Sequence, residues 1–234
     1  MLSEHEVVSQ LSETFPGAIV TTQIPAPKTI YITVNNSFIS SVCHHLFEQG
    51  ARFVISVATD RIKETGKLEV SHILSFDEDC LTVTVKTQVD PSNPSVESIS
   101  AVLPAANWAE RECRDMVGIE FIGHPDPRRL ALADDWPKDV YPLRRDFPYN
   151  YKPPPAPENA VLLNTPQPPA SVFPVGPFYP VLEEPAYFRV FVDGEEIIGC
   201  DYRGFYNHRG IEKLGDSALT YNQVVFLAER ICGI

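Results

Sequence analysis

The chain has 234 residues, of which 44% are hydrophobic and 21% are charged. These proportions are typical of globular proteins with a hydrophobic core and exclude an intrinsically disordered chain. Its 31 acidic and 19 basic residues give a net charge of −12, so nucleic acid and anionic lipid surfaces are not expected partners. The apolar runs are far shorter than the ~20 residues of a membrane-spanning helix, which predicts no direct membrane span.

The first half of the chain shows the periodicities of an α+β fold. A capping box that begins at Ser3 predicts an N-terminal helix, and Ser37 is a candidate N-cap for a second helix that ends near Gly50. A third helix is expected over 104–116. Strand-like runs cover residues 29–34, 52–60, 68–76 and 80–88. The last two runs are too close in sequence for a crossover helix and should pair antiparallel. We predict a two-layer α/β sandwich with a mainly antiparallel sheet.

Proline divides the chain into two parts. Eleven of the 22 prolines lie between Pro148 and Pro180, and proline disfavours both helices and central strands because it lacks a backbone N–H and fixes φ. We expect a semi-rigid linker. After it, Asp193-Gly194 predicts a β-hairpin and the pattern of 221–231 predicts a helix. The predicted division is a domain of residues 1–148, a linker of 149–172 and a C-terminal segment of 173–234.

A dense charged tract resembles a known signature. The segments WAERECRDMVGIEFIGHPDPRRL (108–130) and YPLRRDFP (141–148) resemble the 30 kDa (C-type) subunit of complex I and its relatives in membrane-bound energy-converting [NiFe] hydrogenases and formate hydrogenlyases. Composition alone favours a solvated helix and a polar loop. The resemblance implies instead a docking surface for the large and small subunits. Its candidate interface residues, whose guanidinium groups suit bidentate pairing with carboxylates, are Arg111, Arg114, Arg128, Arg129, Arg144 and Arg145.

The second half looks like the start of a [NiFe]-hydrogenase large subunit, whose complex I homologue is the 49 kDa (D-type) subunit. The matching runs are GPFYP, EEPAYFRVFVDGEEI, YNHRGIEKL and YNQVVFLAERICGI. A C-type module fused to a large subunit is the arrangement in formate hydrogenlyase. The proline-rich tract falls where that junction is expected.

Two residues favour the hydrogenase branch over the quinone-reducing branch. Tyr179 stands where the complex I loop has a histidine that helps to bind quinone, and Cys232 matches the first cysteine of the nickel-binding RxCGxC motif. Soft thiolates suit nickel, although a lone cysteine after a helix is also a common small buried residue. The partner cysteine would fall directly beyond Ile234. The NiFe centre is therefore expected to be complete only in a full-length enzyme, and this chain alone is expected to be inactive.

The RGxE-like run predicts residues that could move protons. Glu212 and His208 lie in YNHRGIEKL, and Glu184 precedes Pro185. Glutamate and histidine can be tuned toward a neutral pKa by burial, so these three residues are candidate catalytic proton relays. The alternative for Glu212 is a solvated surface turn.

The resemblance leads to one preferred function and two alternatives. We expect a subunit of a membrane-associated [NiFe] hydrogenase of the formate hydrogenlyase type that reduces protons to H2. It would contact an iron–sulfur small subunit (B-type) that carries Fe–S clusters, on the cytoplasmic face of the membrane, and be peripheral to it. The alternatives are a complex I-type NADH:quinone oxidoreductase subunit and a non-catalytic scaffold or assembly subunit.

Overall fold

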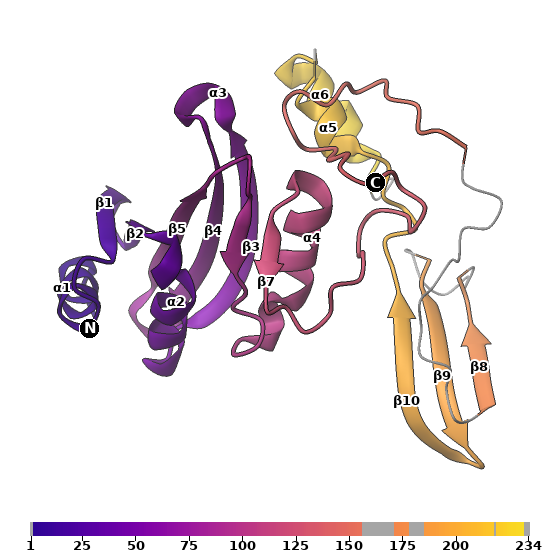
Figure 1. Cartoon of the computed structure of the whole chain (residues 1–234), viewed down its shortest axis with the longest axis horizontal. Coiled ribbons are helices and arrows are strands. Elements are labelled where there is room, and N and C mark those ends of the chain that lie inside the picture. The colour runs from indigo at the N-terminus through magenta and orange to yellow at the C-terminus, as the bar shows by residue number, and fades with distance from the viewer. Residues whose placement is uncertain (1, 156–170, 178–184, 218, 232–234) are drawn as a thin grey trace. The chain divides into compact units, whose positions relative to one another are not determined.

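A computed structural model describes residues 2–155, 171–177, 185–217 and 219–231 (Figure 1). The chain divides into two compact units, Met1–Arg128 and Arg129–Ile234. This division lies well before residue 148, and most of the expected linker lies outside the described residues. The domain limits derived from the sequence therefore stay a prediction.

The first unit is built on a five-stranded sheet in the order β1-β2-β5-β4-β3. Every neighbouring pair is antiparallel except β2 and β5. The predicted mainly antiparallel sheet is confirmed, and so is the antiparallel pairing of β4 with β5. The strands are β1 (Ile19–Ala26), β2 (Thr29–Val34), β3 (Arg52–Arg61), β4 (Lys67–Phe76) and β5 (Leu81–Val89).

Helices α1 (Glu4–Thr14) and α2 (Ile39–Glu48) pack against this sheet. The predicted capping box is present: the Ser3 hydroxyl accepts from the Glu6 backbone N–H, and the Glu6 carboxylate accepts from the Ser3 N–H. The prediction for Ser37 is wrong. A 3-10 turn, Asn36–Phe38, precedes α2 and contains Ser37, so Phe38 occupies the N-cap position without a side-chain bond. A short helix, α3 (Ile62–Thr65), joins β3 to β4.

The buried core explains why this layer is stable. Val7 and Leu11 of α1 and Val42 and Leu46 of α2 are almost fully buried. The sheet contributes the alternate residues of its strands, as period-two burial requires. Its fully buried aliphatic side chains include Ile30, Ile32, Leu68, Leu74, Leu81 and Val83.

A small βαβ unit completes the first unit. Strands β6 (Ser95–Glu97) and β7 (Glu120–Ile122) are parallel, and helix α4 (Asn107–Val117) connects them after a 3-10 turn, Pro104–Ala106. The predicted third helix is confirmed. In such a unit the carboxyl ends of both strands lie at the edge where the helix begins. Residues after β6, after β7 and in the first turn of α4 are thereby brought together.

The second unit contains a three-stranded antiparallel sheet in the order β10-β9-β8. The predicted hairpin at Asp193-Gly194 joins β9 to β10 and is confirmed. Pro174 lies in the edge strand β8, where a missing N–H costs least. Among the described residues, no helix has the length and apolar composition needed to cross a bilayer. The elements are β8 (Ser171–Val175), β9 (Tyr187–Asp193), β10 (Glu196–Arg203), α5 (Ile211–Gly215) and α6 (Tyr221–Glu229).

Candidate functional site

The carboxyl ends of β6 and β7 assemble a buried polar group of side chains from the charged tract. Ser98 follows β6, and its backbone N–H donates to the Ile122 carbonyl at 2.9 Å. His124 follows β7, and Glu110 lies near the start of α4. We call the group the signature cluster. Its members are Ser98, Glu110, Arg111, His124, Asp126 and Arg128.

Glu110 ties α4 to the turn after β6. Its side chain is 0% exposed, and its two carboxylate oxygens accept from the Ser98 hydroxyl at 2.5 Å and the Ile99 backbone N–H at 2.8 Å. Burial raises the pKa of Glu110, and the bonds from Ser98 and Ile99 act in the opposite direction. A buried carboxyl with this set of donors fixes local structure strongly, because the Ile99 N–H would otherwise lose its acceptor.

His124 holds the loop after β7 through a defined tautomer. Its Nδ1 accepts from the Asp126 backbone N–H at 2.9 Å, so that nitrogen carries no proton and Nε2 does. Nε2–H donates to the Asn107 carbonyl at 3.1 Å and lies 3.7 Å from a Glu110 oxygen. The ring is 5% exposed. An imidazole that is hydrogen-bonded through both nitrogens fixes the orientation of the loop after β7.

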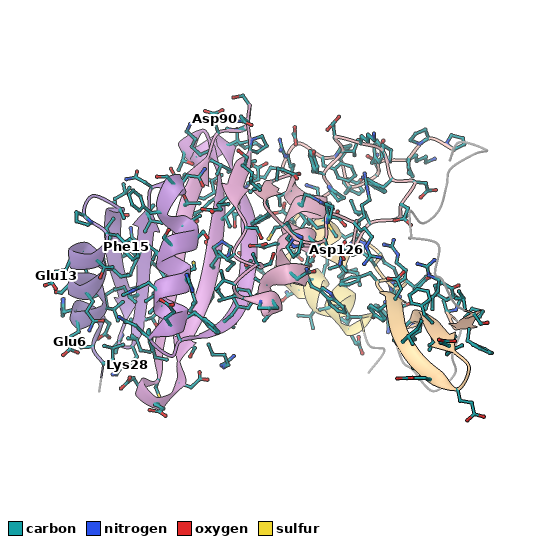
Figure 2. All side chains as sticks on the ribbon, turned by 60° about the horizontal axis from the view of Figure 1, so that its bottom comes forward. Glu6, Glu13, Phe15, Lys28, Asp90 and Asp126 are labelled. Carbon is teal, nitrogen blue, oxygen red and sulfur yellow. The ribbon has the colours of Figure 1, made fainter. Side chains whose placement is uncertain are left out.

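Asp126 organises two arginines. Arg111 is buried, contacts an Asp126 oxygen at 3.1 Å and donates from Nε to the Arg128 carbonyl at 2.8 Å. Asp126, which is labelled in Figure 2, also accepts from Nε and from a terminal nitrogen of Arg128, both at 2.8 Å. The Arg128 guanidinium holds the pKa of Asp126 down at about 2. Asp126 is therefore an ionised anchor for both guanidinium groups.

The six candidate interface arginines differ in exposure. Arg111 is buried, and its contacts lie within the signature cluster. Arg128 presents about half of its side chain, 48%, to solvent, and Arg145 is exposed. Arg114, Arg129 and Arg144 are intermediate. Their role at an interface stays a prediction. The alternative of a solvated α4 does not hold, because Glu110, Arg111 and Asp115 of this helix are all buried.

The proton-relay candidates lie in the second unit or outside the described residues. Glu212 in α5 and His208 before it are exposed, and within the described range 185–217 their side chains share no hydrogen bond or ion pair. The neighbouring Lys213 is buried instead. Glu184 and Cys232 lie outside the described residues, as does Tyr179. The proton-relay and nickel-ligand assignments stay predictions.

The region of the chain that contains the signature cluster matches a known family. The family described as "Respiratory-chain NADH dehydrogenase, 30 Kd subunit" matches residues 32–153, just over half of the chain. The chain belongs to this family. We call the matched region, 32–153, the C-type domain. It includes all six residues of the signature cluster, so the cluster is part of the family's own fold.

Curated relatives extend the similarity beyond the C-type domain. The chain is 39% identical to hydrogenase-4 component G of Escherichia coli (strain K12) over 97% of its length, and 39% identical to formate hydrogenlyase subunit 5 of the same strain over 100%. It spans 42% of the length of each. The C/D subunit of NADH-quinone oxidoreductase from Phocaeicola vulgatus is 35% identical over 64% of this chain and 32% of that protein.

A solved structure resembles the fold. A chain of the membrane-bound sulfane sulfur reductase, an archaeal respiratory membrane complex, aligns with a TM-score of 0.55 and 25% identity. The alignment covers 62% of this chain and 86% of that one. The fold of this chain thus occurs in a subunit of a membrane-bound respiratory complex.

The described residues alone do not make a metal centre. Across 2–155, 171–177, 185–217 and 219–231, no three His, Cys, Asp or Glu side chains are grouped to hold a metal ion. Cys43 and Cys113 are buried and Cys80 and Cys200 are exposed. Burial raises the pKa of Cys113 to about 12 and that of Cys43 further. The buried thiols stay protonated and are poor metal ligands. A nickel site would need ligands outside these residues.

Sequence reasoning missed four members of the signature cluster: Ser98, Glu110, His124 and Asp126. Charged side chains in a helix are usually solvated, so the exposed alternative was the natural one for Glu110. A usable signal exists in the sequence. A parallel β6–α4–β7 unit places the residue after each strand beside the first turn of the helix, and Ser98, Glu110 and His124 occupy those places.

Proposed function

We propose that this chain is part of the large subunit of a membrane-associated [NiFe] hydrogenase of the formate hydrogenlyase type, which reduces protons to H2 in the assembled complex. One observation carries the proposal: the 39% identity to hydrogenase-4 component G and formate hydrogenlyase subunit 5 extends over 97–100% of the chain. The similarity to the C/D relative from NADH-quinone oxidoreductase covers 64%. Residues beyond the C-type domain therefore favour the hydrogenase branch.

The proposal includes a fusion of two modules. The C-type domain ends at residue 153, and we assign the C-terminal segment to the start of a D-type large-subunit domain. The name of the C/D relative supports a fused arrangement in this superfamily. In this assignment the C-type domain positions the catalytic domain in the complex, and the signature cluster holds the shape of the surface that carries Arg128.

The metal centre and the partners are proposals as well. Cys232 would supply one thiolate to a NiFe centre, a group that handles hydride and electrons when bound, and partner subunits would carry the Fe–S clusters. The chain would contact an iron–sulfur small subunit and be peripheral to the membrane on its cytoplasmic side. Arg128 and Arg145 are the exposed candidates among the six arginines, and we assign Arg145 to that contact because a guanidinium pairs well with partner carboxylates.

Purification of the tagged chain from detergent-solubilised membranes of its own host tests the proposal. When the tagged chain is part of a full-length enzyme that carries the remaining nickel ligands, we expect an iron–sulfur protein and nickel to co-purify and H2 to evolve from reduced viologen; residues 1–234 alone should retain no nickel and evolve no H2. NADH:quinone oxidoreductase activity without nickel would show instead that the chain is a complex I-type subunit. Co-purification of an iron–sulfur protein with neither nickel nor H2 evolution nor NADH:quinone activity would favour the scaffold alternative.

A charge-reversal pair sharpens the partner assignment. Arg145→Glu should reduce recovery of the iron–sulfur protein about tenfold or more, because it places like charges together. Lys152→Glu, also at an exposed basic residue, should leave recovery unchanged. Equal recovery with both variants would remove Arg145 from the interface.

A further inference from the structure

The last part of the C-type domain packs with the C-terminal segment. Residues 129–151, which we call the arm, belong to the second compact unit although the family match continues to residue 153. Leu130, Ala131 and Leu132 of the arm are buried. The contacts that join the arm to the C-terminal segment are therefore part of one compact unit.

Arg203, at the end of β10, binds the beginning of the arm through backbone carbonyls. One terminal nitrogen donates to the Arg129 carbonyl at 3.3 Å, and the other donates to the Leu132 carbonyl at 2.8 Å. The first nitrogen also lies 3.6 Å from a carboxylate oxygen of Asp134. The planar fork of arginine suits two acceptors on one stretch of backbone.

Lys213 binds the other end of the arm in the same way. Its side chain is buried, and its ammonium donates to the Arg144 carbonyl at 2.8 Å. The carboxylate of Asp216 lies 3.9 Å away. A buried ammonium must have acceptors, since desolvation without them is very costly. The Arg144 carbonyl is therefore an essential partner of Lys213.

The arm has a shape of its own that presents these carbonyls. The rings of Trp136, Phe147 and Tyr151 form a cluster with centroid separations of 5.1–6.3 Å. The Trp136 indole N–H donates to the Val140 carbonyl at 2.8 Å. Aromatic packing and this hydrogen bond keep the arm folded back on itself between the two carbonyls that are bound, those of Leu132 and Arg144.

We propose that the arm is a docking site for the C-terminal segment, and that Arg203 and Lys213 of this segment recognise the arm through main-chain carbonyls. The partner is a segment of the same chain, and the arm binds it through the hydrogen bonds from Arg203 and Lys213. The backbone carbonyls of Arg129 and Arg144, rather than their side chains, accept these bonds. The inference is independent of the reaction that the complex performs.

Cleavage of the folded full chain tests the docking. A specific protease site placed within residues 156–170 is cut after purification, and the two halves are followed by size-exclusion chromatography and native mass spectrometry. We expect the halves to stay together. Arg203→Gln and Lys213→Gln should each raise the dissociation constant of the cleaved halves about tenfold or more, because each removes a charged donor.

Three further variants keep the test decisive. Arg209→Gln is the matched control: Arg209 donates to the Arg230 carbonyl at 2.7 Å, which lies within the C-terminal segment itself. It should change association less than about twofold, as should Arg129→Ala and Arg144→Ala, which retain the carbonyls. Separation of the cleaved unmodified halves, or equal weakening by Arg209→Gln and Arg203→Gln, would overturn the proposal. Loss of association in Arg144→Ala would overturn recognition through the backbone.

Discussion

The two compact units hold their shape by different means. In the first unit, the sheet and helices bury a continuous aliphatic core that includes Ile32 and Leu46. In the second unit, the buried apolar side chains among the described residues are Leu130, Ala131, Leu132 and Ala186, and α6 buries none of its described side chains. Hydrogen bonds from Arg203 and Lys213 to carbonyls supply much of its order. The comparison teaches that stability in this chain is unevenly distributed.

The largest test of that contrast compares an aliphatic residue in the first unit with an aromatic residue in the second. Ile32→Ala should lower the free energy of unfolding of the first unit by about 4 kcal/mol, because it removes a fully buried side chain and leaves a cavity. Phe226→Ala in α6, where the ring is 67% exposed, should cost no more than about 0.5 kcal/mol. Urea unfolding followed by circular dichroism measures both. Similar losses would contradict the uneven distribution.

The signature cluster gives the next largest effect. Glu110→Ala should destabilise the first unit by about 3 kcal/mol, because it leaves the Ser98 hydroxyl and the Ile99 N–H buried without their acceptor. Glu120→Ala, at an exposed position of β7, is the matched control and should change stability by less than about 0.5 kcal/mol. If Glu110→Ala lowered the free energy of unfolding as little as Glu120→Ala does in urea titration, the cluster would not be a structural anchor.

His72 makes the first unit sensitive to acid. The ring is fully buried in β4, its Nδ1 pairs with the Ser56 hydroxyl at 2.7 Å, and burial lowers the pKa of His72 to about 4. The unfolded chain binds the proton below about pH 6.5 and the folded chain does not. Stability should therefore fall by about 3 kcal/mol as the pH decreases from about 6.5 to about 4.

A pair of variants isolates this contribution from that of the carboxylates. His72→Leu should remove about 3 kcal/mol of the pH dependence between about pH 7.5 and pH 4, measured by urea unfolding. His5→Gln, at an exposed histidine of α1, should leave the pH dependence as it is. Parallel pH profiles for the unmodified chain and His72→Leu would show that His72 does not titrate as expected.

The smallest effect compares two capping boxes. Ser3 caps α1 and Thr220 caps α6 with the same reciprocal pattern. Ser3→Ala should cost about 1 kcal/mol in the unfolding of the first unit. Thr220→Ala should speed hydrogen exchange in α6 and leave that unfolding unchanged, because α6 is packed less closely. If Thr220→Ala shifted the midpoint of urea unfolding of the first unit, the two units would be coupled in their stability.

Periodicity predicted the elements that bury one face. The segment 29–34 alternates in sequence and in burial, and β2 matches it. Strand β1 was missed because its residues are almost all exposed and it includes Pro25 near an irregularity in the pairing with β2. An edge strand is held by backbone pairing, which leaves little pattern in its side chains.

The site was harder to predict than the fold. The resemblance of 108–130 pointed to the correct tract, and the family match confirms it. The burial of Glu110 depends on its bond from Ser98, and the orientation of the His124 ring depends on the Asp126 N–H. Ser98 and Asp126 come from separate loops. Ser37 illustrates the same limit locally, because a cap residue can also be placed in a 3-10 turn. The residue types show which side chains can donate or accept hydrogen bonds, and only the tertiary structure determines which of them pair.

The distribution of cysteines gives the chain a natural pair of attachment points for dyes. Cys80 in the first unit and Cys200 in the second are exposed, whereas Cys43 and Cys113 are buried. Maleimide reagents attack thiolates, so the buried thiols with their raised pKa values should remain unlabelled. With Cys232 replaced by serine, donor and acceptor fluorophores would sit one on each unit. Energy transfer between them would then report changes in the distance between Cys80 and Cys200 in real time, without any probe added to the core.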